Sequence, residues 1–447
     1  MAVRPPYMSH DLDVGTNGTR VGLVCGYMDP TRDGVADYTR RLAVNLRAIG
    51  LDPLVVTTFE LARACGEDAV GVTQRWDVRG IGAAARAIRR LNLDLVHVQY
   101  APSAFGFSRA VGLLPLFLPR KIPLIVTLHE YGVSSGHGPG LSNRSPVWKA
   151  AERFGYADRE TLLLVPSATF VLVPSPEHLD VLRARYQHRG PATLEVPIGL
   201  NVDVTARGPA ARADVRRQLG IAPDAPLIAF FGFLHPEKAL DQLIAAVAAV
   251  RAHRPGARLL LIGGEVSHSV PSDAAHQLRQ ALEQVAVEHG VLDHVHFTGY
   301  LPDAEVGRLL RAADVAAFPF STGVTRKSSS LLTALAAGLP VVATTAPGAV
   351  PGSSESDGVV LVPPGDTPAL ADALLQVLGD RALVGRLTAS GRARAASQNW
   401  AGIAAAHAGV YARALASHRI SRTWTGTAEP SRVVPSTAVE GNADVTA

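Results

Sequence analysis

The feature that most constrains the fold of this 447-residue chain is a repeated alternation of apolar runs and amphipathic stretches. Short runs rich in Val, Ile and Leu, such as residues 20–26 and 54–58, alternate with helix-patterned segments such as residues 36–49. This order is typical of βαβ units, in which parallel strands are joined by helices that cover a sheet. The pattern restarts at residue 226, so we expect an α/β protein with two doubly wound domains facing each other across a cleft.

The same pattern predicts where the domains begin and end. Residues 399–416 open with Asn399 and Trp400 and have the spacing of an amphipathic helix, whereas the remainder is rich in Ser, Thr, Pro and Gly. The expected units are a disordered tail at 1–18, a Rossmann-like domain at 19–205, a second Rossmann-like domain at 206–398, a C-terminal helix at 399–416 and a disordered tail at 417–447.

Composition excludes several classes of function. The net charge of +4 is spread along the chain, and no Lys/Arg-rich run with interleaved aromatic residues is found, so a nucleic-acid partner is not expected. Cys25 and Cys65 form no spacing motif, which predicts neither a disulfide framework nor a metal site. Together with the lack of a signal-peptide pattern, this favours a reducing, cytoplasmic location.

One apolar stretch, residues 111–119, is followed by the basic pair Arg120 and Lys121. The stretch is shorter than the roughly 20 residues that a spanning helix needs. We expect a buried helix under a sheet. The alternative is contact with a membrane surface, which would make the protein peripheral at the inner face of the membrane.

A phosphate site is predicted in the second half of the chain. An apolar strand at residues 314–318 ends in a polar loop, which leads into an Ala/Leu-rich helix. The free N–H groups and the positive dipole end of a helix N-terminus attract anions. The alternative interpretation is a capped helix beside a solvated basic pair. The polar residues at the start of this helix are Arg326, Lys327, Ser328, Ser329 and Ser330.

Two further site candidates lie in the first half. His129 follows the apolar run at residues 122–128, and ligands of open parallel sheets gather at the carboxyl ends of the strands. A histidine satisfied within a loop is the alternative interpretation. Gly34 stands at the entrance to the first helix, where it lets a ligand approach the backbone closely. Its loop is not a GxGxxG sequence, so the dinucleotide-binding fingerprint is absent.

The order and spacing of these motifs resemble the family 4 glycosyltransferases of GT-B fold over nearly all of residues 20–415. Besides His129, the matching segments are residues 34–38, 173–175, 197–202, 231–238 and 297–301, and the most specific is 334–342. Trp400 and its helix are similar to the family's terminal helix, which crosses back to brace the first domain. The resemblance implies transfer of a sugar, with retention, from a nucleotide diphosphosugar to a glycan, lipid-linked or small-molecule acceptor. It also implies that no cofactor or tightly held metal is needed.

The resemblance assigns roles to individual residues. Lys238 matches the family's diphosphate lysine and His129 the histidine near the transferred sugar, which makes these two the catalytic candidates. Ser328 and Ser329 match the phosphate-binding backbone, and Gly34 matches the loop that closes over the distal phosphate. The other donor-binding candidates are Tyr300 and Leu301, which fall where the base usually lies, and Gly232, Thr325, Arg326, Lys327, Ser330 and Thr333.

The chain also departs from the family pattern. Two glutamates usually stand eight positions apart around the phosphate loop, the first holding sugar hydroxyls and the second the ribose. Thr325 and Thr333 occupy those positions here and bind hydroxyl groups more weakly than carboxylates do. Phe233 replaces the arginine after Gly232, and the basic pair before Ser328 is the candidate for the lost cation. These departures predict a divergent branch, with a nucleotide-sugar epimerase of the same fold or a non-catalytic nucleotide-sugar-binding protein as alternatives.

Overall fold

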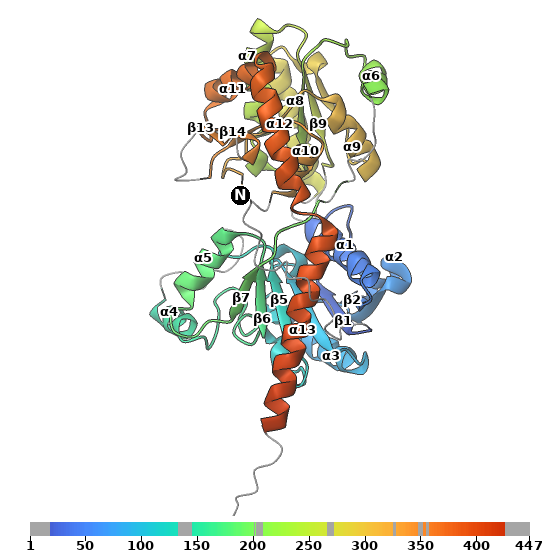
Figure 1. Cartoon of the computed structure of the whole chain (residues 1–447), viewed down its shortest axis with the longest axis vertical. Coiled ribbons are helices and arrows are strands. Elements are labelled where there is room, and N and C mark those ends of the chain that lie inside the picture. The colour runs from blue at the N-terminus through green and yellow to red at the C-terminus, as the bar shows by residue number, and fades with distance from the viewer. Residues whose placement is uncertain are drawn as a thin grey trace, which may run out of the picture.

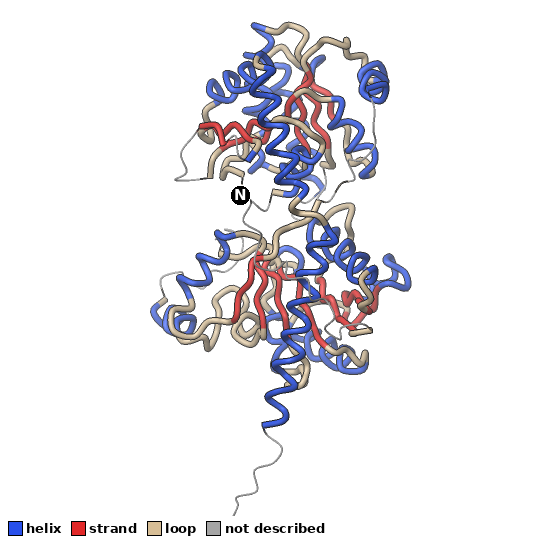
Figure 2. The backbone as a smooth tube through the Cα atoms, in the orientation of Figure 1, coloured by secondary structure: helices blue, strands red, loops and turns tan. Residues whose placement is uncertain are grey.

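The computed structural model describes residues 18–132, 145–200, 202, 209–265, 272–324, 328–346, 352–354 and 357–424. They form two lobes, one above the other in Figure 1, and each lobe is built on one sheet. Figure 2 shows the strands at the centre of each lobe with helices on their flanks. The predicted α/β architecture with two doubly wound sheets is therefore confirmed.

The first sheet has the strand order β3-β2-β1-β4-β5-β6-β7, and every neighbouring pair is parallel. The order reverses between β1 and β4, which is the switch point where ligands of such sheets bind. The strands are β1 Arg20–Cys25, β2 Asp52–Thr58, β3 Ala69–Thr73, β4 Leu95–Tyr100, β5 Leu124–Leu128, β6 Phe170–Val173 and β7 Ala192–Glu195. The α-helices are α1 Gly34–Ala48, α2 Phe59–Cys65, α3 Val78–Arg90, α4 Pro146–Arg153 and α5 Pro176–Arg185.

The second sheet has the order β10-β9-β8-β11-β12-β14-β13, with a switch point between β8 and β11. The edge strand β13 is antiparallel to β14, and the other neighbouring pairs are parallel. The strands are β8 Leu227–Phe231, β9 Arg258–Ile262, β10 Val295–Phe297, β11 Val315–Phe318, β12 Val341–Thr344, β13 Gly352–Ser354 and β14 Val359–Val362. The helices are α6 Pro209–Gln218, α7 Leu240–His253, α8 Ser272–Glu288, α9 Asp303–Ala312, α10 Ser329–Ala336, α11 Thr367–Gly379 and α12 Arg381–Ala396.

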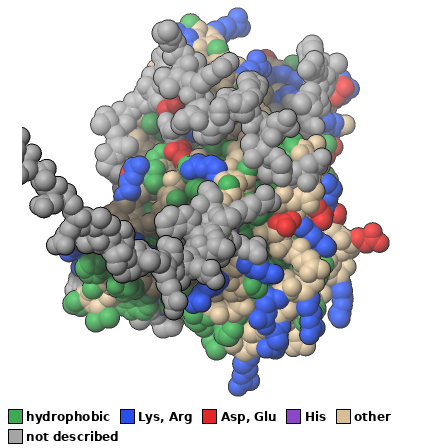
Figure 3. All heavy atoms as spheres, turned by 60° about the horizontal axis from the view of Figure 1, so that its bottom comes forward, with side chains coloured by type: hydrophobic (Ala, Val, Ile, Leu, Met, Phe, Trp, Pro, Cys, Tyr) green, Lys and Arg blue, Asp and Glu red, His purple; other side chains and the backbone are tan. Residues whose placement is uncertain are grey.

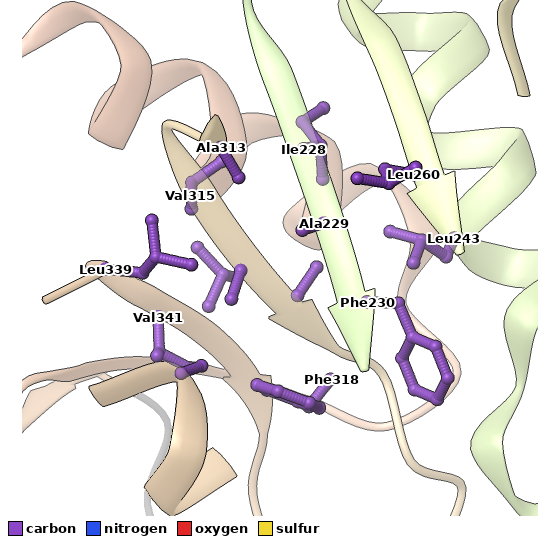
Figure 4. Close-up of a cluster of buried hydrophobic side chains, with 14 of the residues drawn as sticks. Ile228, Ala229, Phe230, Leu243, Leu260, Ala313, Val315, Phe318, Leu339 and Val341 are labelled. Carbon is purple, nitrogen blue, oxygen red and sulfur yellow. The ribbon is translucent and has the colours of Figure 1, made fainter. Parts of the chain in front are cut away.

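The core of the second lobe lies between the central strands and their helices. Figure 4 shows side chains from β8, β9 and β11 beside Leu243 of α7, Leu339 and Val341. Phe230 and Phe318 are fully buried, with ring centroids 5.9 Å apart. Burial of each such side chain contributes roughly 1.5–3 kcal/mol. This packing fixes the carboxyl ends of β8 and β11, where the predicted donor site begins.

Aspartate side chains define where several helices begin. The Asp33 carboxylate accepts a hydrogen bond from the Ala36 backbone N–H at the start of α1. Asp77, Asp366 and Asp380 cap α3, α11 and α12 in the same way. Each cap of this kind contributes about 1 kcal/mol to the stability of its helix.

The last helix, α13 Trp400–Trp424, leaves the second lobe and runs along the first (Figure 1). It packs against α1, and Ile403, Ala404 and Tyr411 are buried in the first lobe's core. The indole N–H of Trp400 donates to the Leu200 carbonyl at 2.6 Å. The expected end at residue 416 was wrong, because the sequence has no Gly or Pro at residues 417–425 to end the helix there. Residues 417–424 are therefore helical rather than part of the expected tail.

The apolar stretch at residues 111–119 is half buried. It contains the 3₁₀ helix η3 Ala110–Leu116, in which Val111 and Leu114 are fully buried. By contrast, Leu116 is 63% exposed and Phe117 43% exposed. Among the described helices, none combines the length and the hydropathy that crossing a membrane requires. On the face drawn in Figure 3, Lys and Arg side chains occur at several separate places among apolar ones.

Candidate active site

His129 lies directly after β5, at the carboxyl edge of the first sheet and next to β4, which borders the switch point. Its backbone N–H donates to the Tyr100 carbonyl at 2.8 Å, and its side chain is largely buried. The ring nitrogen Nε2 lies 2.8 Å from Oε1 of Gln99, and the Tyr38 ring contacts the imidazole edge-on with centroids 4.8 Å apart. His129 therefore lies at the strand end expected of a ligand-binding residue, and Gln99 and Tyr38 fix the orientation of its ring.

Two more histidines, His97 and His407, are buried near His129. His97 is fully buried on β4, with its two ring nitrogens 2.8 Å from the Tyr411 hydroxyl and 2.7 Å from the Thr127 hydroxyl. Burial, followed by the nearby His407 and His129, lowers the pKa of His97 well below its usual value. Burial also lowers the pKa of His407 to about 4. Both imidazoles are therefore neutral at pH 7. This group of buried side chains around His97 was not predicted, because its members are far apart in the chain.

Gly34 is the first residue of α1, and apart from its chain neighbours and its own helix backbone no atom of the described residues lies within 4 Å of the place where a Cβ would stand. This open side lets another group approach the helix entrance. The Asp33 carboxylate, however, already accepts from the Ala36 N–H at 2.8 Å. An anion at this entrance would meet that negative charge and the N–H groups together.

Lys238 ends the short 3₁₀ helix η4 Pro236–Lys238, after β8. Its ammonium lies 3.7 Å from the ring centroid of Phe320, in the loop after β11. Ser321 ties the two loops together, because its backbone N–H donates to the Glu237 carbonyl at 2.9 Å. The loops that follow β8 and β11 thus meet at the switch point of the second sheet, and Lys238 lies where they join.

Helix α10 begins beyond the same loop. Ser328 is the N-cap residue, its side chain makes no capping bond, and Ser328, Ser329 and Ser330 are all partly exposed. Thr333 differs, since it is fully buried and its hydroxyl donates to the Ser329 carbonyl at 2.9 Å. The serine turn is therefore partly exposed, whereas the Thr333 hydroxyl is buried and bonded within the helix. Thr325, Arg326 and Lys327 lie outside the described residues.

Gly232 and Gly263 make the close contact between the ends of β8 and β9. Gly232 has φ 150°, and its N–H donates to the Ile262 carbonyl at 2.9 Å. A Cβ on Gly263, at φ 144°, would stand 2.0 Å from the Gly232 carbonyl oxygen. Only glycine fits such a close approach of two backbones.

Phe233 and Tyr300 lie on either side of Gly264. A Cβ on Gly264 would be 3.3 Å from the Phe233 ring and 3.4 Å from the Tyr300 Cβ. Tyr300 is 52% exposed, whereas Leu301 packs against the core of the second lobe. The residue that replaces the family's arginine therefore stands beside the predicted base-binding positions and offers them an aromatic surface. From the sequence, Phe233 had indicated only the loss of the arginine's positive charge.

The two lobes are joined by an ion pair that the sequence did not predict. Arg41 on α1 binds Asp37 on the same helix at 2.9 Å and also pairs with Asp303 at the start of α9. Partial burial, followed by Asp303 and Asp37, raises the pKa of the Tyr300 phenol. Tyr300 therefore lies close to the α1–α9 contact between the lobes. Within the described ranges, no group of three or more His, Cys, Asp or Glu side chains has the arrangement of a metal site.

Two family models match the chain. Residues 32–204 match "Glycosyltransferase Family 4", and residues 225–380 match "Glycosyl transferases group 1". In a solved structure, sucrose-phosphate synthase from Thermosynechococcus elongatus, the fold is similar with a TM-score of 0.66. That comparison covers 89% of this chain and 100% of the other at 23% identity, so it concerns the fold alone.

Among curated proteins, D-inositol 3-phosphate glycosyltransferase of Nocardia farcinica is 34% identical over 52% of this chain and 49% of its own length. The GDP-mannose-dependent alpha-(1-6)-phosphatidylinositol monomannoside mannosyltransferase of Mycobacterium tuberculosis is 31% identical over 45% of this chain and 51% of its own. The chain thus spans about half the length of these relatives. The two family models together extend over both lobes, one matching the first lobe and the other the second. The chain therefore belongs to the group 1, family 4 glycosyltransferases, which have the GT-B fold.

Proposed function

We propose that this protein is a retaining glycosyltransferase that moves a hexosyl group from a nucleotide diphosphosugar to an acceptor hydroxyl. The observation that carries the proposal is the meeting of Lys238 with the loop that leads to α10. A lysine and a helix N-terminus at one sheet edge supply a cation and N–H donors for a diphosphate. The second lobe, proposed at residues 206–398, is the donor side, and the first, at 19–205, is the acceptor side.

The chemistry follows from where charge develops. The bond between the anomeric carbon and the diphosphate oxygen breaks, and the nucleoside diphosphate leaves with the electron pair. The acceptor oxygen forms its bond to the same face of that carbon and gives its proton to the departing diphosphate oxygen. Lys238 and the N–H groups at Ser328, Ser329 and Ser330 stabilise the leaving charge, and such preorganised donors act most strongly in the transition state.

The remaining site residues bind and orient the donor. We assign His129 to the transferred sugar, and Tyr300, Leu301 and Phe233 to the base. Gly232 and Gly34 allow close approach of the backbone from the two lobes. We assign Thr325 to sugar hydroxyls, and Arg326 and Lys327 to the diphosphate, from the sequence alone. Thr333 is the weakest member of the predicted set, because its hydroxyl is buried and bonded within α10.

The names of the two curated relatives suggest which acceptors to test first. One is named for D-inositol 3-phosphate and the other for a phosphatidylinositol monomannoside. We propose an acceptor that carries an inositol or a related polyol, either free or lipid-linked. A lipid-linked acceptor would suit a peripheral position at the inner face of the membrane, with Leu116 and Phe117 as the exposed apolar contacts.

The experiment begins with a donor screen by thermal shift across nucleotide sugars, since a bound ligand raises apparent stability by mass action. Nucleotide release is then measured with and without each acceptor. Acceptor-dependent release supports the transferase, conversion of the donor sugar to its epimer without an acceptor supports an epimerase of the same fold, and donor binding with neither reaction supports a non-catalytic binding protein. Release that depends on an acceptor without an inositol or related polyol would contradict the acceptor class alone.

A further inference from the structure

A buried chain of polar side chains links His129 to helix α13. It starts at the 2.8 Å contact between His129 Nε2 and Gln99 Oε1 and continues from the Gln99 amide nitrogen to the ring of His97. His97 Nδ1 lies 2.8 Å from the Tyr411 hydroxyl on α13. His97, Gln99 and Tyr411 are all fully buried. Buried polar networks of this kind are stable only when every member has a partner, and they hold their members in one arrangement.

The contacts of Gln99 fix the orientation of its amide. The amide nitrogen lies 3.3 Å from both ring nitrogens of His97. Those nitrogens already have hydroxyl partners, at Tyr411 and Thr127. Gln99 directs its nitrogen at the His97 ring and its carbonyl oxygen at His129. A carbonyl oxygen only accepts, so Nε2 of His129 is the nitrogen that carries the hydrogen.

A second contact holds the same ring from its edge. Tyr38 touches His129 with an interplanar angle of 73°, and its hydroxyl lies 3.5 Å from Nε2 of His407 on α13. Nδ1 of His407 lies 2.8 Å from the Ile403 carbonyl, which can only accept. A neutral His407 therefore donates from Nδ1 and accepts the Tyr38 hydroxyl hydrogen at Nε2. Two residues of α13 thus support the side chains that contact His129. His407 bonds Tyr38, and Tyr411 bonds His97, which contacts Gln99.

We propose that Gln99 is a positioning residue that holds His129 as the Nε2–H tautomer in one ring orientation, with α13 anchoring Gln99 through His97 and Tyr411. This inference rests on the proposed function, in which His129 contacts the transferred sugar. With Nε2 donating to Gln99 in the neutral imidazole, Nδ1 is the ring nitrogen that carries the lone pair. The C-terminal helix then shapes the active site as well as bracing the first lobe.

The test compares Gln99→Met, which keeps the length of the side chain but loses the acceptor, with Gln99→Glu, which keeps an acceptor. Transfer is measured with the donor and acceptor found in the screen above. We expect Gln99→Met to lower kcat about 10- to 100-fold, the usual loss when a partner that orients a histidine is removed. The KM for the donor should change less than threefold, because the donor's diphosphate contacts are untouched. Gln99→Glu should recover most of the lost kcat.

A second measurement does not depend on turnover. In full-length protein labelled with ¹⁵N-histidine, the wild type should show a slowly exchanging Nε2–H signal that disappears in His129→Asn. Gln99→Met should lose that signal while its melting temperature stays within a few degrees of wild type. Gln187→Met is the matched control, since Gln187 is exposed and its side chain donates to the nearby Ala184 carbonyl. It should keep both the signal and the activity.

The outcomes separate the two proposals. A wild type that binds donors, transfers nothing and still shows the His129 signal contradicts the proposed function but leaves the Gln99–His129 bond in place. A Gln99→Met variant with kcat within twofold of wild type overturns the positioning role. Equal losses in kcat, KM and melting temperature, without recovery in Gln99→Glu, would also overturn it, because they indicate general damage. If Gln99→Met does not fold, Gln99→Leu and Tyr411→Phe replace it in the same comparison.

Discussion

The Lys238 ammonium lies 3.7 Å from the ring centroid of Phe320. Because the lysine follows β8 and the phenylalanine follows β11, the contact joins the two strands at the switch point of the second sheet. A cation–π contact of this kind contributes about 0.5–2 kcal/mol, depending on its exposure. It holds the lysine side chain against the loop that leads to α10, within its own lobe.

The first prediction concerns that lysine. Lys238→Ala should lower kcat/KM about 10²- to 10³-fold, because an oriented donor to a leaving anion contributes roughly 3–4 kcal/mol to transition-state stabilisation. Steady-state kinetics with a saturating acceptor measure the loss. Lys149→Ala, an exposed lysine on α4, is the control and should behave as wild type. Near-normal turnover in Lys238→Ala would remove this lysine from the donor site.

Local sequence patterns predicted the elements better than they predicted the contacts between them. Strand β11 spans Val315–Phe318, within the apolar run at residues 314–318 that predicted it, because its apolar pattern is complete within five residues. The partners of the site histidine were not predicted. Gln99 and Tyr38 come from different elements, and nothing near His129 in the sequence indicates them.

Two other differences have local physical causes. No strand was predicted at residues 69–73, where β3 lies, because so short a strand shows little alternation. Its Gly71 lies so close to α2 that a Cβ would be 2.6 Å from the Phe59 Cα. Thr333 was predicted to replace a ribose-binding glutamate from its position alone. Its shorter side chain instead bonds the carbonyl one turn earlier in α10, as threonines within helices commonly do.

The second prediction concerns the C-terminal helix. A chain that ends at residue 424 should match the full chain in stability and donor binding, because it keeps all of α13. A chain that ends at residue 398 should lose at least about 3 kcal/mol, since it exposes the apolar surface that Ile403 and Tyr411 cover. Urea unfolding of the three proteins measures this. Equal stability of both truncated chains would show that α13 does not brace the first lobe.

The third prediction concerns the basic pair before α10 and rests on the sequence. Replacing both Arg326 and Lys327 with alanine should weaken binding of the nucleoside diphosphate at least about tenfold, because charge-assisted bonds to phosphate contribute roughly 1.5–3 kcal/mol each. The affinity for the free nucleoside should not change. Isothermal titration calorimetry with both ligands gives the ratio, and an Arg89→Ala, Arg90→Ala variant on α3 is the control. An unchanged ratio would leave Lys238 and the backbone amides as the diphosphate ligands.

The fourth prediction concerns pH. Burial lowers the pKa of His407 to about 4 in the folded protein, whereas an unfolded histidine has a pKa of about 6.5. Between these values the unfolded chain binds more protons than the folded chain. Stability should therefore be full above about pH 6.5 and should fall by roughly 3 kcal/mol as the pH is lowered to 4. His97, whose pKa burial also lowers, acts in the same direction.

Free energies of unfolding at several pH values from 7 to 4.5 measure this loss. His407→Leu removes one of the two buried titrating groups, so its stability should fall less steeply over this range than that of the wild type. His253→Leu is the control, because His253 is exposed near the end of α7 and should leave the slope unchanged. If His407→Leu loses stability as steeply as the wild type, then His407 does not remain neutral in the folded protein. The Tyr38 hydroxyl would in that case have no acceptor on α13.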